Sequence, residues 1–254
     1  VVLVAIGGSA TTDGGAGMLQ ALGMKFFDEN GRELEPGIGG GRLEQIRRID
    51  DRNWDPRIAD SRFIIASDVL NPLIGPNGAA SIFAPQKGAS PADVALLDRA
   101  LAHWADLIQR ATGKRVHDLP GAGAAGGIGA ALAAFFPSET RRGVDLVIEY
   151  AGLEQALANA SALFTGEGRI DAQTVSGKTP LGAAEAAHKR RIPVFVLAGS
   201  VGPGVEPLYS RGITSIHSIV SGPMPLDEAM RRGAELLTAQ AEQVMRTWLA
   251  GRRR

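Results

Sequence analysis

Short apolar runs that each end in a loop of Gly, Ser, Asp or Asn residues recur along this chain, and they limit its fold most strongly. The runs are "VVLVAI" (1–6), "RFIIA" (62–66), "ALF" (162–164), "PVFVLA" (193–198) and "TSIHSIV" (214–220). Such runs are typical of strands that are buried on both faces of a parallel sheet. Helical stretches lie between them, so the sequence predicts an α/β fold with mainly parallel sheets.

Two of the stretches between the strands have clear helix patterns. The first is predicted over residues 91–112, because Ser90 can cap its start, Pro91 suits its first turn and Gly113 can end it. The second is predicted over residues 226–249 as one continuous helix. Its inward-facing residues are expected to be Leu226, Met230, Leu237, Val244 and Trp248.

Composition restricts the class of protein. Lys plus Arg number 27 and Asp plus Glu number 27, so the net charge is zero, which argues against nucleic acid as a partner. The absence of cysteine excludes disulfides, thiolate zinc sites and cysteine nucleophiles, and it is compatible with the predicted cytoplasmic location. The uncharged stretch 119–138 holds too many glycines for a membrane span, so no membrane partner is expected.

The segment "TGEGRIDAQTVSGKT" (165–179) combines carboxylates with basic and hydroxyl side chains. It ends in Gly-Lys-Thr, but a phosphate-binding P-loop needs a glycine at the position that Ala172 occupies, so it is not a P-loop. The segment nevertheless leaves a strand and enters a helix near Pro180. Such a loop lies at the carboxyl end of a sheet, where open α/β folds bind ligands, and it is placed to hold an anion.

A second segment, "GGSATTDGGAG" (7–17), follows the opening strand directly. Gly7 and Gly8 permit close approach of the backbone to a ligand. Asp13 is placed to cap a helix or to help hold a metal. Hydroxyl groups come from Ser9, Thr11 and Thr12. The segment is a plausible anion site, and an ordinary tight turn capped by Asp13 is the alternative.

Two single residues also qualify as site candidates. Lys87, in "APQKGAS" (84–90), can reach a phosphate as a point charge, although a solvated lysine is the alternative. Asp68 follows the strand 62–66 and should face the ligand side of the sheet, with a turn-forming role as the alternative.

The glycines of "PGAGAAGGIGAAL" (120–132) match G-x-G-x-x-G, but no strand precedes them as a dinucleotide site requires. A nicotinamide-dependent dehydrogenase is therefore a weak alternative, and a glycine-rich helix start packed tightly on a neighbour is the expected structure. The histidines show no metal-ligand spacing.

Taken in order, four segments resemble the bacterial glycerate kinase type I family. They are "GGSATTDGGAGMLQALG" (7–23), "DVLNPLIGPNGAASIFAPQKGA" (68–89), "PGAGAAGGIGAAL" (120–132) and "TGEGRIDAQTVSGKTPLG" (165–182). The resemblance covers essentially the whole chain. Thr12 stands where many family members have Asn.

The resemblance implies an ATP-dependent kinase that uses Mg²⁺ and acts on D-glycerate. It implies two α/β domains with a ligand cleft between them. The first is expected at residues 1–155, and residues 156–254 are expected to form a Rossmann-like α/β portion that would pair with a missing N-terminal segment. Family members carry an N-terminal α/β segment that this chain lacks, so part of the cleft is expected to be absent and activity of the chain alone to be low. "VVLVAI" is expected to lie inside a sheet with neighbours on both sides.

By the same resemblance, the site residues fall into two sets. Glu167 and Asp171 are assigned to metal binding or hydroxyl activation, with Lys178 and Asp68 as further catalytic candidates. Substrate and phosphate binding is assigned to Gly7, Gly8, Ser9, Thr11, Asp13, Lys87, Arg169, Gln173 and Thr174. A structural salt bridge between Arg169 and Asp171 is the alternative for that pair. A family member that binds a small anion without turnover is the alternative function, and a homo-oligomer remains open.

Overall fold

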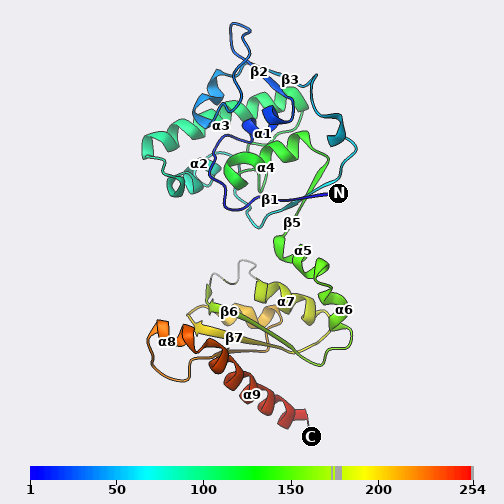
Figure 1. Ribbon diagram of the computed structural model, residues 1–254, viewed down its shortest axis with the longest axis vertical. Coiled ribbons are helices and arrows are strands. Elements are labelled where there is room, and N and C mark those ends of the chain that lie inside the picture. The colour runs from blue at the N-terminus through cyan, green and yellow to red at the C-terminus, as the bar shows by residue number, and fades with distance from the viewer. Residues whose placement is uncertain (173, 175–178, 253–254) are drawn as a thin grey trace. The chain divides into compact units, whose positions relative to one another are not determined.

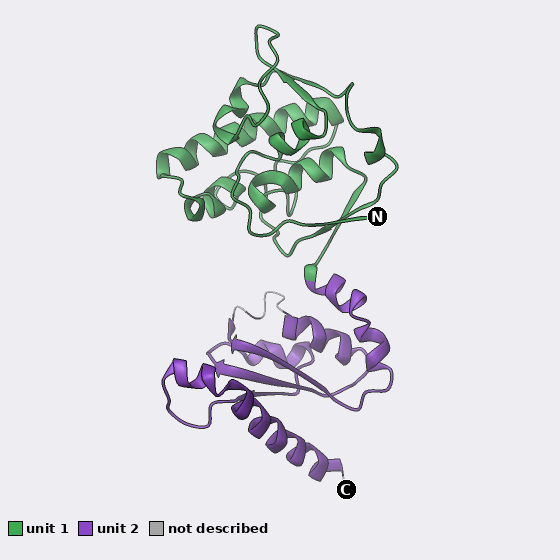
Figure 2. Ribbon diagram, in the orientation of Figure 1, with its two compact units in different colours: residues 1–143 green, residues 144–254 purple. Residues whose placement is uncertain are grey.

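The computed structural model describes residues 1–172, 174 and 179–252 (Figure 1). The chain divides into two compact units, Val1–Gly143 and Val144–Arg254 (Figure 2). Each unit has its own sheet and its own buried apolar residues. The mixed α/β fold and the parallel pairing that the sequence predicts are confirmed in both units.

Unit 1 contains a parallel sheet in the order β1 (Val2–Ala5), β4 (Phe63–Ala66) and β5 (Ser138–Arg141). A separate antiparallel pair is formed by β2 (Lys25–Phe27) and β3 (Arg48–Asp50). Its α-helices are α1 (Ala16–Ala21), α2 (Ala79–Phe83), α3 (Pro91–Thr112) and α4 (Ala124–Phe135). Its 3-10 segments are η1 (Gly40–Gln45), η2 (Pro56–Ile58) and η3 (Pro85–Lys87).

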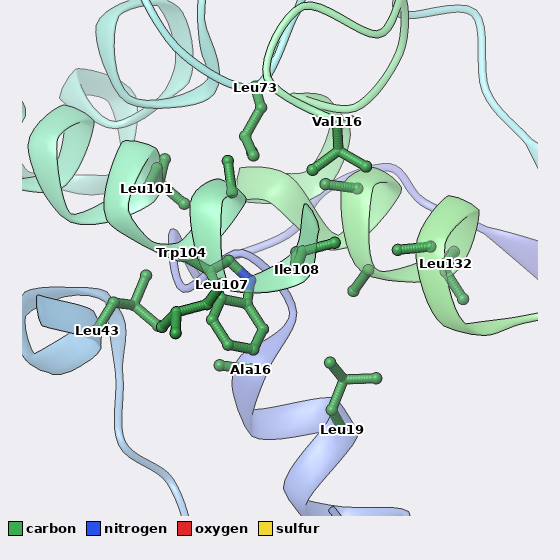
Figure 3. Packing of buried hydrophobic residues seen from close by; sticks show 14 of the residues in the cluster. Ala16, Leu19, Leu43, Leu73, Leu101, Trp104, Leu107, Ile108, Val116 and Leu132 are labelled. Atoms are coloured by element: carbon green, nitrogen blue, oxygen red, sulfur yellow. The ribbon is translucent and has the colours of Figure 1, made fainter. Parts of the chain in front are cut away.

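The long helix α3 forms the centre of the unit 1 core, as Figure 3 shows. Its predicted bounds are confirmed, because Ser90 and Asp93 form a reciprocal capping box and Gly113 ends the helix at φ 74°. Trp104 is fully buried on this helix and packs edge-on against Phe26 at 5.3 Å between ring centroids. This buried face fixes α3 against the segments that carry the unit 1 site residues.

Unit 2 contains a parallel sheet in the order β6 (Leu163–Ile170), β7 (Val194–Val201) and β8 (Ser215–Ser218). Its helical elements are α5 (Gly143–Tyr150), α6 (Leu153–Leu157), α7 (Thr179–His188), η5 (Glu206–Arg211), α8 (Leu226–Arg231) and α9 (Gly233–Arg252). Residues of β7 alternate between two clusters: Val194 and Val196 pack with α7, whereas Phe195 and Leu197 pack with α9.

One strand prediction is wrong. The strand β1 pairs with β4 on one side, and within the described residues no strand pairs with its other side. Val2 is 41% and Leu3 50% exposed, so the uniformly apolar run is an edge strand here. Apolar composition alone did not distinguish an interior strand from an edge strand, because both contain apolar residues that pack on one face.

The predicted helix over residues 226–249 is also corrected. The chain forms two helices, α8 and α9, which are interrupted at Arg232. Leu226 is 74%, Met230 73% and Leu237 45% exposed, whereas Val244 is buried as predicted. Because α8 is a separate short helix, its apolar side chains do not continue the buried face of α9.

The units divide after Gly143, whereas the sequence suggested a division near residue 155. The helices α5 and α6 belong mainly to unit 2 because Ile148, Leu153 and Leu157 pack into its core. The predicted ligand cleft between the domains stays a prediction. None of the helices in the described ranges combines the length and the hydropathy that crossing a bilayer requires.

Candidate active site

Lys87 connects two of the predicted unit 1 segments. Its ammonium group donates hydrogen bonds to Ser9 Oγ at 3.0 Å and to the carbonyl oxygen of Thr11. Partial burial lowers the pKa of Lys87, and the nearby Asp13 carboxylate opposes that shift. A cation and a hydroxyl group therefore lie together just beyond the end of β1.

Asp13 has a structural partner in the start of α1. Its side chain is almost fully buried and accepts the N–H groups of Gly15 at 3.1 Å and Gly17 at 3.0 Å. These contacts satisfy backbone donors that the first turn of a helix leaves open. Asp13 therefore caps α1, and its charge acts on Lys87 from this fixed position.

The glycine-rich start of α4 packs against the backbone of the segment 7–17. Gly126 has φ 68°, and a Cβ atom at this position would lie 2.0 Å from the carbonyl oxygen of Thr11. Gly14 N–H also donates to the Gly126 carbonyl oxygen at 3.0 Å. The predicted close packing of a glycine-rich helix start is confirmed, and it holds the backbone that presents Ser9 and Thr11.

A cavity of about 380 Å³ opens beside this group. Its lining includes Thr12, Gly40 and Lys87, together with the first turn of α3 at Asp93. Gly7 and Gly8 have no described atom within 4 Å of where their Cβ atoms would lie. The φ of 66° accounts for the glycine at position 8, whereas neither φ nor packing within the described residues accounts for Gly7. A ligand that touches the backbone here is compatible with that open space.

Asp68 is exposed, and its Oδ1 accepts the N–H of Gly143 at 3.0 Å. Gly143 is the first residue of α5, so Asp68 satisfies a backbone donor that the start of a helix leaves open. This structural contact differs from the turn-forming role that was the alternative, and the catalytic assignment of Asp68 stays a prediction.

The unit 2 candidates lie differently from the sequence expectation. Glu167 and Arg169 belong to β6, which continues to Ile170, whereas the sequence suggested that the strand ends at residue 164. The extension arises because backbone pairing with β7 continues as far as Ile170 and Val201. Local composition hid this strand, since glycines and charged residues are uncommon in strands.

Arg169 and Asp171 form the ion pair that was the alternative to a catalytic role. Arg169 Nε donates to Asp171 Oδ2 at 2.9 Å, and the two side chains are 64% and 20% exposed. Thr174 is fully buried, and its Oγ1 accepts the N–H of Asp171 at 3.2 Å. Gln173 and Lys178 lie outside the described residues.

A second cavity, of about 890 Å³, lies wholly within unit 2 at the carboxyl ends of β6 and β7. The sequence interpretation missed most of its lining, because the residues come from β6, from β7, from the end of β8 with the segment after it, from α8 and from α9. The one available signal was the recurrence of glycine at positions 166, 168 and 199 near the strand ends.

These features define a class of protein with two α/β units, in which polar, glycine-rich segments follow parallel strands. Within this class, the chain belongs to the glycerate kinase family, whose model matches residues 1–249.

Several relatives show how far the similarity extends. A "Glycerate kinase" from Halalkalibacterium halodurans is 46% identical over 96% of this chain and 63% of its own length. The "Glycerate 2-kinase" of Escherichia coli is 44% identical over 99% of this chain and 66% of its own length. A crystal structure assigned to glycerate kinase 2 from Salmonella typhimurium LT2 matches with a TM-score of 0.82 and 41% identity, covering 99% of this chain and 66% of that one. The chain thus spans 63% to 66% of the length of these proteins.

Proposed function

We propose that this protein is a kinase that transfers a phosphoryl group from ATP to D-glycerate with the help of Mg²⁺. Membership of the glycerate kinase family supports the reaction class. The observation that carries the proposal is the cluster of Lys87, Ser9 and Thr11 just beyond the end of β1. We also propose a cytoplasmic location, with which the lack of cysteine is compatible.

The unit 1 cluster is suited to holding an anionic group. Phosphoryl transfer depends on positioning and on neutralising charge as the phosphoryl group moves. Lys87 supplies a positive charge in a partly buried position, where attraction to an anion is stronger than in bulk water. Ser9 and the Thr11 carbonyl hold its ammonium group in place, and the open backbone at Gly7 and Gly8 gives a ligand room.

The unit 2 residues would serve the phosphate and metal side of the reaction. Arg169 is a fixed cation at the end of β6, and we assign it, with Lys178, to anionic groups of the substrates. Gln173 and Thr174 are assigned to substrate binding. Glu167 and Asp171 are assigned to Mg²⁺ or to activation of the glycerate hydroxyl.

The donor set fits Mg²⁺ that is shared with phosphates. Within the described part of the chain, no group of three or more acidic or histidine side chains could enclose a metal. Kinases commonly hold Mg²⁺ through one or two carboxylates and substrate phosphate oxygens, so Glu167 and Asp171 are a sufficient protein contribution. When bound, Mg²⁺ would neutralise charge on the phosphate oxygens.

A family member that binds an anion without turnover is the second candidate. The ion pair between Arg169 and Asp171 favours it, because a carboxylate already paired with an arginine is less available for catalysis. Measuring ADP release separates the two functions. With the N-terminal segment that the family resemblance implies in place, we expect D-glycerate to stimulate ADP release when ATP and Mg²⁺ are present and L-lactate to have no effect. Equal ADP release with and without D-glycerate in that protein would rule out the kinase.

A further inference from the structure

Three glycines lie among the side chains on the floor of the large cavity of unit 2. Gly166 and Gly168 follow Phe164 at alternate positions of β6, on the face that packs towards α9, and Gly199 follows Leu197 on β7. Leu197 and Val201 also line the cavity, so exposed peptide groups lie between aliphatic side chains. A planar ring can lie against such a surface.

The walls of the cavity are largely apolar. They come from the segment after β8, from α8 and from the start of α9, and they include Ile219, Val220, Met224, Leu226, Met230 and Leu237. Methionine side chains adapt to the shape of a ligand. The hydroxyl-bearing residues Ser200 and Ser218 also line the space. A mostly apolar space with a few polar groups is the usual composition of a small-molecule site.

The position of the cavity connects it to the candidate phosphate residues. Glu167 and Gly168 line the cavity, and Arg169 is the next residue of the same strand. The Arg169 side chain is 64% exposed and its guanidinium is fixed by Asp171. Side chains alternate along β6, so Arg169 leaves the strand on the face opposite Gly168, but its guanidinium lies beside Gly202, just past the end of β7. A ligand with an aromatic end in the cavity and an anionic end that extends past the strand ends would meet this cation. The volume of about 890 Å³ is ample for such a ligand.

We propose that this cavity binds the nucleoside portion of the phosphoryl donor, with the phosphates directed along β6 towards Arg169. The inference rests on the proposed function, because that function requires a nucleotide. It adds a binding site for the base and ribose that the sequence interpretation did not contain. Leu226 and Met230 then form an apolar cover over the nucleoside from α8.

Two substitutions on opposite walls test the proposal. A Cβ atom on Gly168 would meet no described atom within 4 Å, so the backbone has room for the added side chain of Gly168→Val, which narrows the cavity at its lining. Ala229 lines the cavity from α8, and Ala229→Phe narrows it from the other side. Ala234→Phe is the matched control, because Ala234 is an exposed residue of α9 that does not line the cavity.

Calorimetric titration should be performed with ATP, adenosine and inorganic tripolyphosphate. We expect both cavity variants to weaken ATP and adenosine binding by at least about tenfold and to leave tripolyphosphate binding unchanged. The control should bind all three like the wild type. Circular dichroism shows whether each variant is folded, and Ala229→Phe decides the matter if Gly168→Val does not fold.

Two results would overturn the proposal: ATP binding by the folded cavity variants that equals that of the wild type, or adenosine that does not bind the wild type. Loss of self-association in Ala229→Phe with unchanged ATP binding would identify a protein-contact surface instead.

The kinase assignment is tested separately. Glycerate-dependent turnover with an unchanged KM for ATP in the variants would refute only the nucleoside site, and nucleotide binding without turnover would refute only the kinase.

Discussion

At the scale of single residues, Lys87 combines a charge with partial burial, and this combination determines its response to pH. Burial lowers the pKa of its ammonium group, and the Asp13 carboxylate compensates only in part. The protonated form is the one that attracts an anion. Anion affinity should therefore fall as the pH rises through this lowered pKa, at a lower pH than for an exposed lysine.

Substitution of Lys87 tests this argument. We expect the KM for the anionic substrate that Lys87 holds to rise at alkaline pH in the wild type. Lys87→Arg should abolish that rise, because a guanidinium stays protonated throughout the range. Lys87→Met should raise KM at every pH by about ten- to a hundredfold, the usual effect of losing a hydrogen bond to a charged group. Steady-state kinetics between pH 7 and 10 provide the measurement, and identical pH profiles for wild type and Lys87→Arg would contradict the role of Lys87.

Asp171 is the second residue whose role can be tested directly. If Asp171 activates a hydroxyl or holds Mg²⁺, Asp171→Asn should lower turnover by about 10²- to 10⁴-fold. Loss of the partly exposed ion pair with Arg169 should change the free energy of unfolding by only about 0–1 kcal/mol. Turnover and urea unfolding should be measured on the same preparation. Near-normal turnover with a large loss of stability would show that the residue is structural.

The chain offers a matched control for this substitution. Asp55 forms the same kind of pair with Arg57, two residues away, and it lies outside the proposed site. The hydrogen bond from the Arg57 side chain lowers the pKa of Asp55 to about 2. Asp55→Asn therefore removes a comparable ion pair at neutral pH. We expect it to leave turnover unchanged, which separates loss of an ion pair from loss of a catalytic carboxylate.

At the scale of elements, the start of α4 is the strongest constraint on the unit 1 site. Because the backbone at Gly126 lies directly against Thr11, Gly126→Ala should clash and displace the segment that carries Ser9 and Thr11. Gly31→Ala is the matched control, because Gly31 also has a positive φ, 73°, but open space around it. The control should cost about 1–2 kcal/mol of unfolding free energy from backbone strain.

Gly126→Ala should cost at least about 2 kcal/mol more than the control, since a backbone clash adds to the strain. It should also raise the KM of the substrate that Lys87 holds. Urea unfolding and steady-state kinetics of the two variants supply the comparison. Equal unfolding free energies would mean that the close contact between Gly126 and Thr11 does not determine the local structure.

The sequence predicted correctly those elements whose bounds are determined by residues within the element or next to it. The bounds of α3 follow from its capping box and from Gly113, all within the helix or next to it. The strand β5 was missed because "SETR" has no apolar pattern and is a strand only through its pairing with β4. The break between α8 and α9 was missed because the apolar spacing continues across it.

The candidate site, like the fold, was predictable only where the signal is local in the sequence. The polar segment after the strand 1–6 was enough to single out Ser9 and Thr11, and Lys87 was singled out as a lysine beside a glycine in a loop. The sequence could not show that Lys87 binds Ser9, which is 78 residues away, because that contact depends on how α1, α3 and α4 pack together. The unit 2 cavity was not predicted for the same reason, since its lining is drawn from five separate segments.

At the scale of the whole molecule, the apolar cores are separate. One cluster lies entirely in unit 1, and the other two lie entirely in unit 2. Units with separate cores can lose their structure at different denaturant concentrations. We therefore expect unfolding of this chain to deviate from a single two-state transition.

The positions of the three tryptophans allow this to be measured. Trp54 and Trp104 lie in unit 1 and Trp248 lies in unit 2, so the fluorescence of Trp248→Phe reports on unit 1 alone. Far-ultraviolet circular dichroism reports on both units. We expect the urea unfolding transition that fluorescence reports for this variant to have a different midpoint from the one that circular dichroism reports. Coincident transitions would indicate that the two units unfold cooperatively as one.

The contact between Gly126 and Thr11 also bears on how this protein can change during evolution. Two main chains touch there with no side chain between them, so the short distance between the two backbones depends on the lack of a Cβ atom at position 126. No compensating substitution on the partner can restore it, because every residue at position 11 presents the same carbonyl oxygen. Substitution of Gly126 is therefore not tolerated. By contrast, Ile128, a partly buried neighbour on the same helix, can exchange for other apolar residues.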